Sequence, residues 1–173
     1  MSVDVRSTRD AHGWTRYSEL SEAERGECLS AAADLTNTIY DGLDVGPEIR
    51  AIAAQGFGDT VLLSDNLTLA GLALCHCGAN TEAGTDTCYI KFAAVRPGTN
   101  APQLFDRLLD CCNSFAGSRQ LKRIEAGVNL ARQEAYQKML ARGFRTALQG
   151  VAMHKPNEPG YSRSDVYVID DWR

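Results

Sequence analysis

The sequence contains no long hydrophobic run. No apolar stretch approaches the roughly 18 residues that a membrane-spanning helix requires. The first ten residues are polar and include Asp4 and Asp10, which the apolar segment of a secretory signal would not tolerate. We therefore expect a protein that makes no membrane contact, is not exported and works in the cytoplasm.

Cysteine pairs at metal-binding or redox spacing are also absent. The fragment Cys75-His76-Cys77 lacks the C-x-x-C spacing, and no second pair of ligands lies near it in the sequence. Structural zinc sites normally take four ligands in recognisable pairs. On a strand, Cys75 and Cys77 would share one face, which suits small core residues. Without an export signal, all six cysteines are expected to be reduced thiols, and we expect no metal.

Repeats, linkers and low-complexity stretches are missing as well. A chain of 173 residues with 44% hydrophobic and 23% charged residues falls within the range of single globular domains. Residues 1–173 are therefore expected to form one domain.

The formal net charge of −4 is distributed unevenly. Residues 117–145 hold seven basic and two acidic residues, a net charge of +5, which leaves −9 for the rest of the chain. Such a segment is either an ordinary solvated helix face or a contact surface for an anionic small molecule. The acidic pI of 5.4 argues against general nucleic-acid binding.

Hydrophobic periodicity and turn residues predict an α/β protein. Apolar residues recur at helical spacing in four segments, 19–38, 47–55, 101–116 and 130–142. Strands are expected at 60–63, 69–77, 88–95, 123–128, 144–154 and 165–170. The nearly continuous apolar run of residues 88–95 is typical of a strand that is buried on both faces.

The segment from Tyr89 to Phe144 has the order strand, loop, helix, strand, helix. A crossover of this length places its two strands parallel to each other. The loop 96–100 then lies beyond the carboxyl end of a strand, where open α/β sheets bind ligands. Because the next helix begins with unpaired N–H groups, the segment predicts a phosphate-bearing ligand at this point.

This order of elements resembles the GNAT superfamily of acyl-CoA N-acyltransferases over nearly the whole chain. The local matches are Val95-x-Pro97 followed by Leu108-Leu109, the strand Ile124–Val128, and Ala135 with the closing pair Gly143-Phe144. The resemblance implies a mixed sheet of about six to seven strands with helices on both faces. No strand is assigned before Glu19.

The resemblance also implies a site for acetyl-CoA or another acyl-CoA. In the family, the splayed edge of the long strand binds the pantetheine arm, and main-chain N–H groups of the loop and helix start hold the pyrophosphate. In this sequence the corresponding residues are Ala93, Val95, Asn100, Ala101, Gln103 and Leu104. Arg132, within the basic segment, is a further candidate because a guanidinium pairs well with phosphate.

The loop departs from the family's pattern of Gln or Arg, two residues, Gly, one residue, then Gly or Ala. The three places hold Asn100, Gln103 and Phe105, and Pro102 removes one N–H from the helix start. Since glycine lets a backbone approach phosphate closely, Gln103 and Phe105 are expected to crowd that approach.

The catalytic positions depart from the family as well. Many members place a tyrosine four residues before the Gly-Phe pair to protonate the leaving thiolate, and here that position is Met139; the usual asparagine, eleven residues before the glycine, is Arg132. Tyr136, one turn from Met139, is the candidate acid; the alternative is an ordinary helix aromatic packed on the sheet. His76 and His154 are candidate bases or structural histidines.

The expected function is N-acetyl transfer, in which the amine of a small molecule or peptide attacks the thioester directly. This route demands less of the side chains than an acyl-cysteine intermediate at Cys75, Cys77, Cys111 or Cys112. The amine would enter between residues 19–55 and the final strands, near Asp41, Asp44, Glu48 and Asp59. A homodimer is compatible with this reading. The alternative is a GNAT-fold protein that has lost its chemistry and serves as an acyl-CoA sensor or interaction module.

Overall fold

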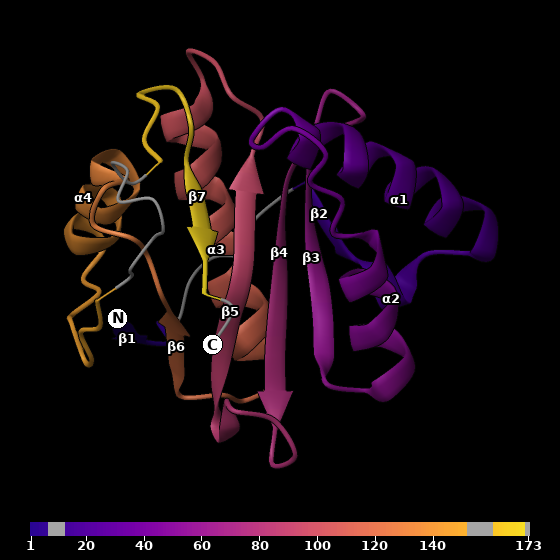
Figure 1. The fold of residues 1–173 in the computed structure, drawn as a ribbon. Helices are drawn as coiled ribbons and strands as arrows, with labels where there is room; N and C mark the ends of the chain where they lie inside the picture. Colours follow the sequence, from indigo (N-terminus) through magenta and orange to yellow (C-terminus); the bar gives the residue numbers. More distant parts are fainter. Residues whose placement is uncertain (7–12, 152–160, 172–173) are drawn as a thin grey trace.

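The computed structural model describes residues 1–6, 13–151 and 161–171, which form one mixed sheet with helices on both faces (Figure 1). The sheet has seven strands in the order β1-β6-β5-β4-β3-β2, and β7 pairs with β5 outside this path. Among these strands, β5 and β6 run parallel and the other neighbours are antiparallel. The predicted mixed α/β architecture is confirmed.

The elements follow the chain in an order close to the predicted one. They are β1 (Ser2–Asp4), β2 (Trp14–Arg16), a 3-10 turn (Tyr17–Glu19), α1 (Glu22–Asn37), α2 (Gly46–Gln55), β3 (Gly58–Asp65), β4 (Thr68–Gly78), β5 (Gly84–Val95), α3 (Ala101–Ser118), β6 (Arg123–Ala126), α4 (Gln133–Ala141) and β7 (Val168–Asp170).

Local chemistry explains where the helices begin and end. Ser21 caps α1 in a capping box with Glu24, whose side chain accepts a hydrogen bond from the Ser21 N–H at 2.8 Å. Pro47 occupies the first turn of α2, where its missing N–H costs nothing, and Gly56 ends that helix in the left-handed conformation with φ of 67°.

Two apolar clusters cover the two faces of the sheet. On one face, α1 and α2 pack Leu35 and Ile49 against sheet residues such as Leu72. On the other, α3 and α4 pack Phe105 and Met139 against the opposite side of the same strands. Both clusters take side chains from the segment that contains β7, because alternate strand residues point to opposite faces.

The two ends of the chain differ from the predictions. β1 and β2 were not predicted; β1 pairs with the free edge of β6, with Val3 opposite Ile124. The strand predicted at 144–154 is wrong for residues 144–151, where Arg145 forms only an isolated bridge to Ser2, and 152–154 lie outside the described residues. The physical reason is that β1 already occupies the edge of β6 that such a strand would need.

In the described part of the chain, no helix is long and apolar enough to cross a bilayer.

Candidate functional site

Strand β5 changes partners halfway along its length. Its first part pairs with β6, from Thr87 opposite Arg123 to Ile90 opposite Ala126. A bulge follows, since Leu74 of β4 faces Phe92 while Cys75 faces Ile90, which leaves Lys91 as an extra residue. The pairing with β6 stops at this bulge. We name the space beside Lys91–Val95, which β6 no longer borders, the β5 slot.

In this structure β7 fills the β5 slot (Figure 1). Phe92, Ala93 and Ala94 lie opposite Asp170, Ile169 and Val168 in an antiparallel ladder. At its two ends the Asp171 N–H donates to the Lys91 carbonyl at 2.7 Å, and the Val95 N–H donates to the Tyr167 carbonyl at 3.4 Å. The edge at Ala93 and Val95, predicted to bind pantetheine, is therefore paired with the chain's own C-terminal segment.

Buried charged side chains hold β7 in place. Arg132, which is 6% exposed, forms a two-point ion pair with Asp170 and also donates to the Tyr40 hydroxyl. Burial opposes the charge on Arg132, but the Asp170 carboxylate outweighs it and raises the pKa of the guanidinium. The sequence predicted that Arg132 would bind a cofactor phosphate. In the structure its guanidinium instead binds the Asp170 carboxylate on β7.

The last described residue, Asp171, lies where β5 and β6 separate. A Cβ atom on Gly127, the residue after β6, would lie 1.9 Å from an Asp171 carboxylate oxygen. Only glycine leaves room for this carboxylate, so the end of β6 and the segment after β7 fit together closely.

The start of α3 offers few free N–H groups for phosphate. The Ala101 N–H donates to the Gly98 carbonyl, the Leu104 N–H donates to the Asn100 carbonyl, and Pro102 has no N–H. Gln103 is the remaining first-turn position, and its N–H has no acceptor within the helix. Within the first turn of α3, residues 101–104, the predicted phosphate cradle is thus reduced to one main-chain donor, that of Gln103.

The predicted crowding by Phe105 is wrong. Its ring is fully buried and packs against Tyr167, with the ring centroids 5.5 Å apart. The side chain points into the core because Phe105 lies on the stripe of α3 that also carries Leu108 and Cys112. Gln103, by contrast, is exposed at the helix start.

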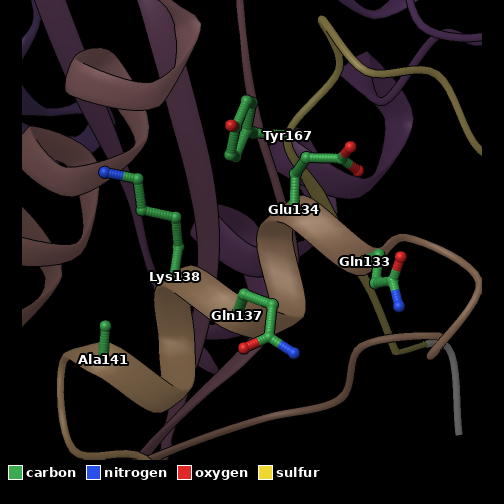
Figure 2. Close-up of a pocket in the computed structure, with 6 residues that line it drawn as sticks. All are labelled: Gln133, Glu134, Gln137, Lys138, Ala141 and Tyr167. Atoms are coloured by element: carbon green, nitrogen blue, oxygen red, sulfur yellow. The ribbon is translucent and has the colours of Figure 1, made fainter.

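A cavity of about 600 Å³ lies beside Tyr167 and α4 (Figure 2). Figure 2 shows the Tyr167 ring above α4, between the side chains of Glu134 and Lys138. Burial raises the pKa of Tyr167, and the nearby Glu134 carboxylate acts in the same direction, so the hydroxyl remains protonated at neutral pH. The cavity residues are Gln133, Glu134, Gln137, Lys138, Ala141 and Tyr167.

The candidate acid Tyr136 is half-buried on α4 and does not line that cavity. It lies one helical turn after Arg132, whose carbonyl accepts the Tyr136 N–H at 3.1 Å. Its backbone therefore follows by one turn the N-cap residue whose side chain holds β7. Met139, at the family's tyrosine position, is fully buried in the core.

Most of the basic segment is neutralised by carboxylates. Lys138 and Arg142 both pair with Asp106 on α3, and Arg142 also pairs with Asp110. Lys122 pairs with Asp86 at 2.8 Å. Together with the Arg132–Asp170 pair, these contacts account for four of the seven basic side chains, so the segment's excess charge mainly ties elements together.

A cluster of ionisable side chains lies near the inner end of the β5 slot. His76 on β4 faces Tyr89 on β5, and its Nδ1 lies 3.1 Å from a carboxylate oxygen of Glu82. The other Glu82 oxygen is 2.8 Å from Nζ of Lys91, the bulged residue. Burial alone would raise the pKa of Glu82, but the hydrogen bonds from Lys91 and His76 lower it to about 2.

Sequence reasoning found His76 but missed its two partners. Glu82 lies in the β4–β5 turn and Lys91 is a charge inside an apolar strand, so neither shows the spacing of a motif. The one available signal was Lys91 itself, because a lysine in a buried strand requires a partner. His154, the other candidate base, lies outside the described residues.

Five of the six cysteines are buried, as predicted, and Cys28 is partly exposed. Cys75, Cys88 and Cys112 are fully buried, and hydrogen bonds from Cys112 and Cys88 raise the pKa of Cys75 well above its ordinary value. Burial raises the pKa of Cys111 to about 12. A nucleophilic cysteine requires the opposite shift. Across the described residues, no three His, Cys, Asp or Glu side chains gather as a metal site would require.

The acidic residues near the N-terminal helices have different roles. Asp59 is buried and accepts hydrogen bonds from the N–H and hydroxyl of Ser18, so it faces no solvent. Asp44 accepts from the Gly46 N–H at 2.8 Å at the start of α2. Asp41 and Glu48 are exposed. Of the four residues expected to attract a cationic amine, Asp41 and Glu48 are therefore the better candidates, because Asp59 and Asp44 already accept hydrogen bonds within the protein.

Comparison with solved structures identifies the architecture. A Thermus thermophilus protein, TTHA1254, superposes with a TM-score of 0.54 at 19% identity, covering 74% of this chain and 90% of that chain. A Trypanosoma brucei acetyltransferase gives 0.53 at 14% identity, covering 82% of this chain and 97% of that one. The chain has the GNAT fold.

A third matching structure is yncA of Salmonella typhimurium, a proposed acetyltransferase solved with its cofactor acetyl-CoA. It superposes with a TM-score of 0.53 at 15% identity, covering 91% of this chain and 92% of that chain. No protein-family model and no curated protein matches the sequence. At these identities the likeness to GNAT structures shows the fold, and the chemistry must be argued from the site.

Proposed function

We propose that this protein is an acyl-CoA-dependent N-acyltransferase of the cytoplasm that moves acetyl or another short acyl group to the amine of a small molecule or peptide. The observation that carries the proposal is the bulge at Lys91, where β5 parts from β6 and offers a backbone edge to an extended chain. The acetyl-CoA bound to yncA, a protein of the same fold, supports this choice of cofactor.

The cofactor would lie in the β5 slot with its pantetheine arm along Ala93 and Val95. Its phosphates would lie toward Asn100, Ala101, Gln103 and Leu104, because Val95 leads into the loop before α3. With Ala101, Pro102 and Leu104 unable to offer free N–H groups, Gln103 supplies the main-chain donor. Binding should therefore depend on the pantetheine arm more than on the phosphates.

His76 is proposed as the base that takes the proton from the acceptor amine. Cys75 and Cys77 point toward α3 and α4, so His76 between them points to the opposite face, where its ring lies 6.2 Å from that of Phe57. The bond from Nδ1 to Glu82 orients the ring and leaves Nε2 to accept a proton.

Transfer then proceeds by direct attack of the amine on the thioester carbonyl. The amine nitrogen forms the new C–N bond, the C–S bond breaks, His76 takes the amine proton, and the leaving thiolate takes a proton from Tyr136. Tyr136 is proposed for this role because it follows Arg132 by one turn, and Arg132 holds β7 in the slot. Exposed Asp41 and Glu48 would attract the amine in its cationic form, which loses one proton to solvent before the neutral amine attacks. After product release, His76 returns its proton to solvent and Tyr136 regains one.

The second candidate is a GNAT-fold protein without chemistry that senses acyl-CoA or binds a partner. Three observations favour it: the buried Met139 at the tyrosine position, Pro102 at the helix start, and β7 in the slot. Both candidates require the slot to bind an acyl-CoA or a partner, and they differ in whether thioester is consumed.

The test is to incubate the full-length protein with acetyl-CoA and a panel of amines and short peptides. Thioester loss is followed by chromatography, since the six protein thiols would react with thiol reagents. The acyltransferase reading predicts amine-dependent consumption that His76→Gln and Tyr136→Phe each reduce about 100-fold, within the range of general acid–base catalysis. Acetyl-CoA binding without consumption across the panel would favour the sensor. No binding at millimolar acetyl-CoA would overturn the acyltransferase and the acyl-CoA sensor, and would leave the partner-binding module.

A further inference from the structure

We propose that β7 is an internal competitor of the acyl-CoA arm: residues 166–171 occupy the cofactor's place, and acyl-CoA binds only when they leave. The inference rests on the proposed function and adds regulation to the same site. In this proposal, the conformation in which β7 pairs with β5 is the closed, resting state of the enzyme.

The competition follows from shared hydrogen-bonding groups. The backbone of β5 from Lys91 to Val95 offers one set of N–H and carbonyl groups on the side of the slot, and β7 uses it at both ends and between. A backbone edge can pair with one extended chain at a time. The pantetheine arm and β7 therefore cannot occupy Ala93 and Val95 together.

The segment also fills the volume on both sides of the slot. Tyr167 and Ile169 pack into the cluster beneath α3 and α4, while Val166 and Val168 pack into the cluster beneath α1 and α2. All four side chains are at most 6% exposed. A ligand that displaces β7 must refill this apolar space, which suits the extended, partly apolar arm of an acyl-CoA.

Two polar side-chain attachments hold the C-terminal segment at identifiable points. Arg132 grips Asp170 from the start of α4, and Tyr161 anchors the approach by donating from its hydroxyl to the Ile39 carbonyl at 2.8 Å. The Tyr161 ring also packs against Tyr40, with centroids 4.4 Å apart. β7 itself is only three residues long, so release of the Arg132 grip should free the strand without disturbing the β5–β6 pairing.

The consequence is a reduced apparent affinity for the cofactor. If only a fraction of molecules has β7 out of the slot, the apparent Kd exceeds the intrinsic Kd by the inverse of that fraction. Any change that weakens the closed state, and leaves the open slot intact, must tighten acyl-CoA binding.

The experiment compares acetyl-CoA binding by the wild type, Asp170→Asn and Asp165→Asn, using calorimetric titration. Asp165 is the matched control: it lies in the same segment and carries the same charge, and its ion pair with Arg163 is exposed, with both side chains 45% accessible. Asp170→Asn is expected to lower the apparent Kd at least about tenfold, and Asp165→Asn to leave it within about twofold.

Hydrogen exchange on the wild type provides the second readout. Upon saturation with acetyl-CoA, the Asp171 N–H should lose its protection because it loses the Lys91 carbonyl. The Val95 N–H should stay protected because the ligand replaces the Tyr167 carbonyl, and the Cys77 N–H, bonded to Phe57 at 2.8 Å in another part of the sheet, should not change.

Two failures can be told apart. Equal affinity in all three proteins, with Asp171 still protected in the complex, would overturn the competition and leave the proposed function standing, with the cofactor seated elsewhere, such as the cavity beside Tyr167. No binding by any of the three at millimolar acetyl-CoA would overturn the proposed function and the competition together.

Discussion

The ion pair between Arg132 and Asp170 is predicted to be the strongest polar anchor of β7. Replacement of Asp170 by Asn leaves the Arg132 guanidinium 7% exposed and without its counter-charge. Removing one member of a buried pair costs about 3–5 kcal/mol. Because the Asp170 side chain is 20% exposed, and an amide oxygen can still accept from Arg132, we expect a loss of about 2 kcal/mol in the free energy of unfolding.

A double-mutant cycle isolates this interaction. Once Arg132→Met has removed the guanidinium, Asp170→Asn should cost little, so the cycle should give a coupling of about 2 kcal/mol by urea unfolding. The same cycle on the exposed pair Arg163 and Asp165 should give at most about 1 kcal/mol. A coupling for Arg132 and Asp170 no larger than that control would refute the claim that this pair holds β7.

Three further predictions concern other parts of the molecule. Phe105→Ala should lower the free energy of unfolding by about 3–5 kcal/mol, measured by denaturant titration, because it empties a fully buried site against Tyr167. Glu82 has a pKa of about 2, below its ordinary 4.5, so its contribution to stability is complete above about pH 5 and disappears as the pH falls toward 2. Glu82→Gln should therefore flatten the curve of unfolding free energy against pH between about pH 5 and pH 2. An unchanged curve would contradict the claim that His76 and Lys91 stabilise the Glu82 carboxylate. Cys28, half-exposed but with a pKa raised to about 11 by burial, should react slowly with iodoacetamide at pH 8, yet sooner than the five buried cysteines, as peptide mass spectrometry would show.

The central part of the fold was predictable because its signals are local. The apolar run 88–95, the Pro102 helix start and the Gly143 stop each act within a few residues, and together they fix the parallel crossover from β5 to β6. The bulge at Lys91 left one trace in the sequence, a single charge within an apolar strand.

The outer strands were predictable only in part. β7 lies within the strand predicted at 165–170, but the sequence carries no signal for its pairing with β5, and β1, three residues long, is too short for periodicity to show. Each is fixed by partners more than 70 residues away along the chain. The residues 144–154 have the local pattern of a strand, yet it is β1 that pairs with β6.

The candidate site shows the same division. The backbone edge at Ala93 and Val95 was located from the resemblance, but its occupation by β7 depends on the tertiary pairing of Arg132 with Asp170. Arg132 was read as a phosphate ligand because its charge is visible in the sequence and its partner is not.

A crystal structure of the protein with acetyl-CoA tests most directly whether the β5 slot is the acyl-CoA site. We expect the pantetheine arm along Lys91–Val95, hydrogen-bonded to Ala93 and Val95, with residues 166–171 moved out of the slot. Acetyl-CoA bound while β7 remains paired with Phe92–Ala94, or bound elsewhere on the molecule, would contradict this expectation.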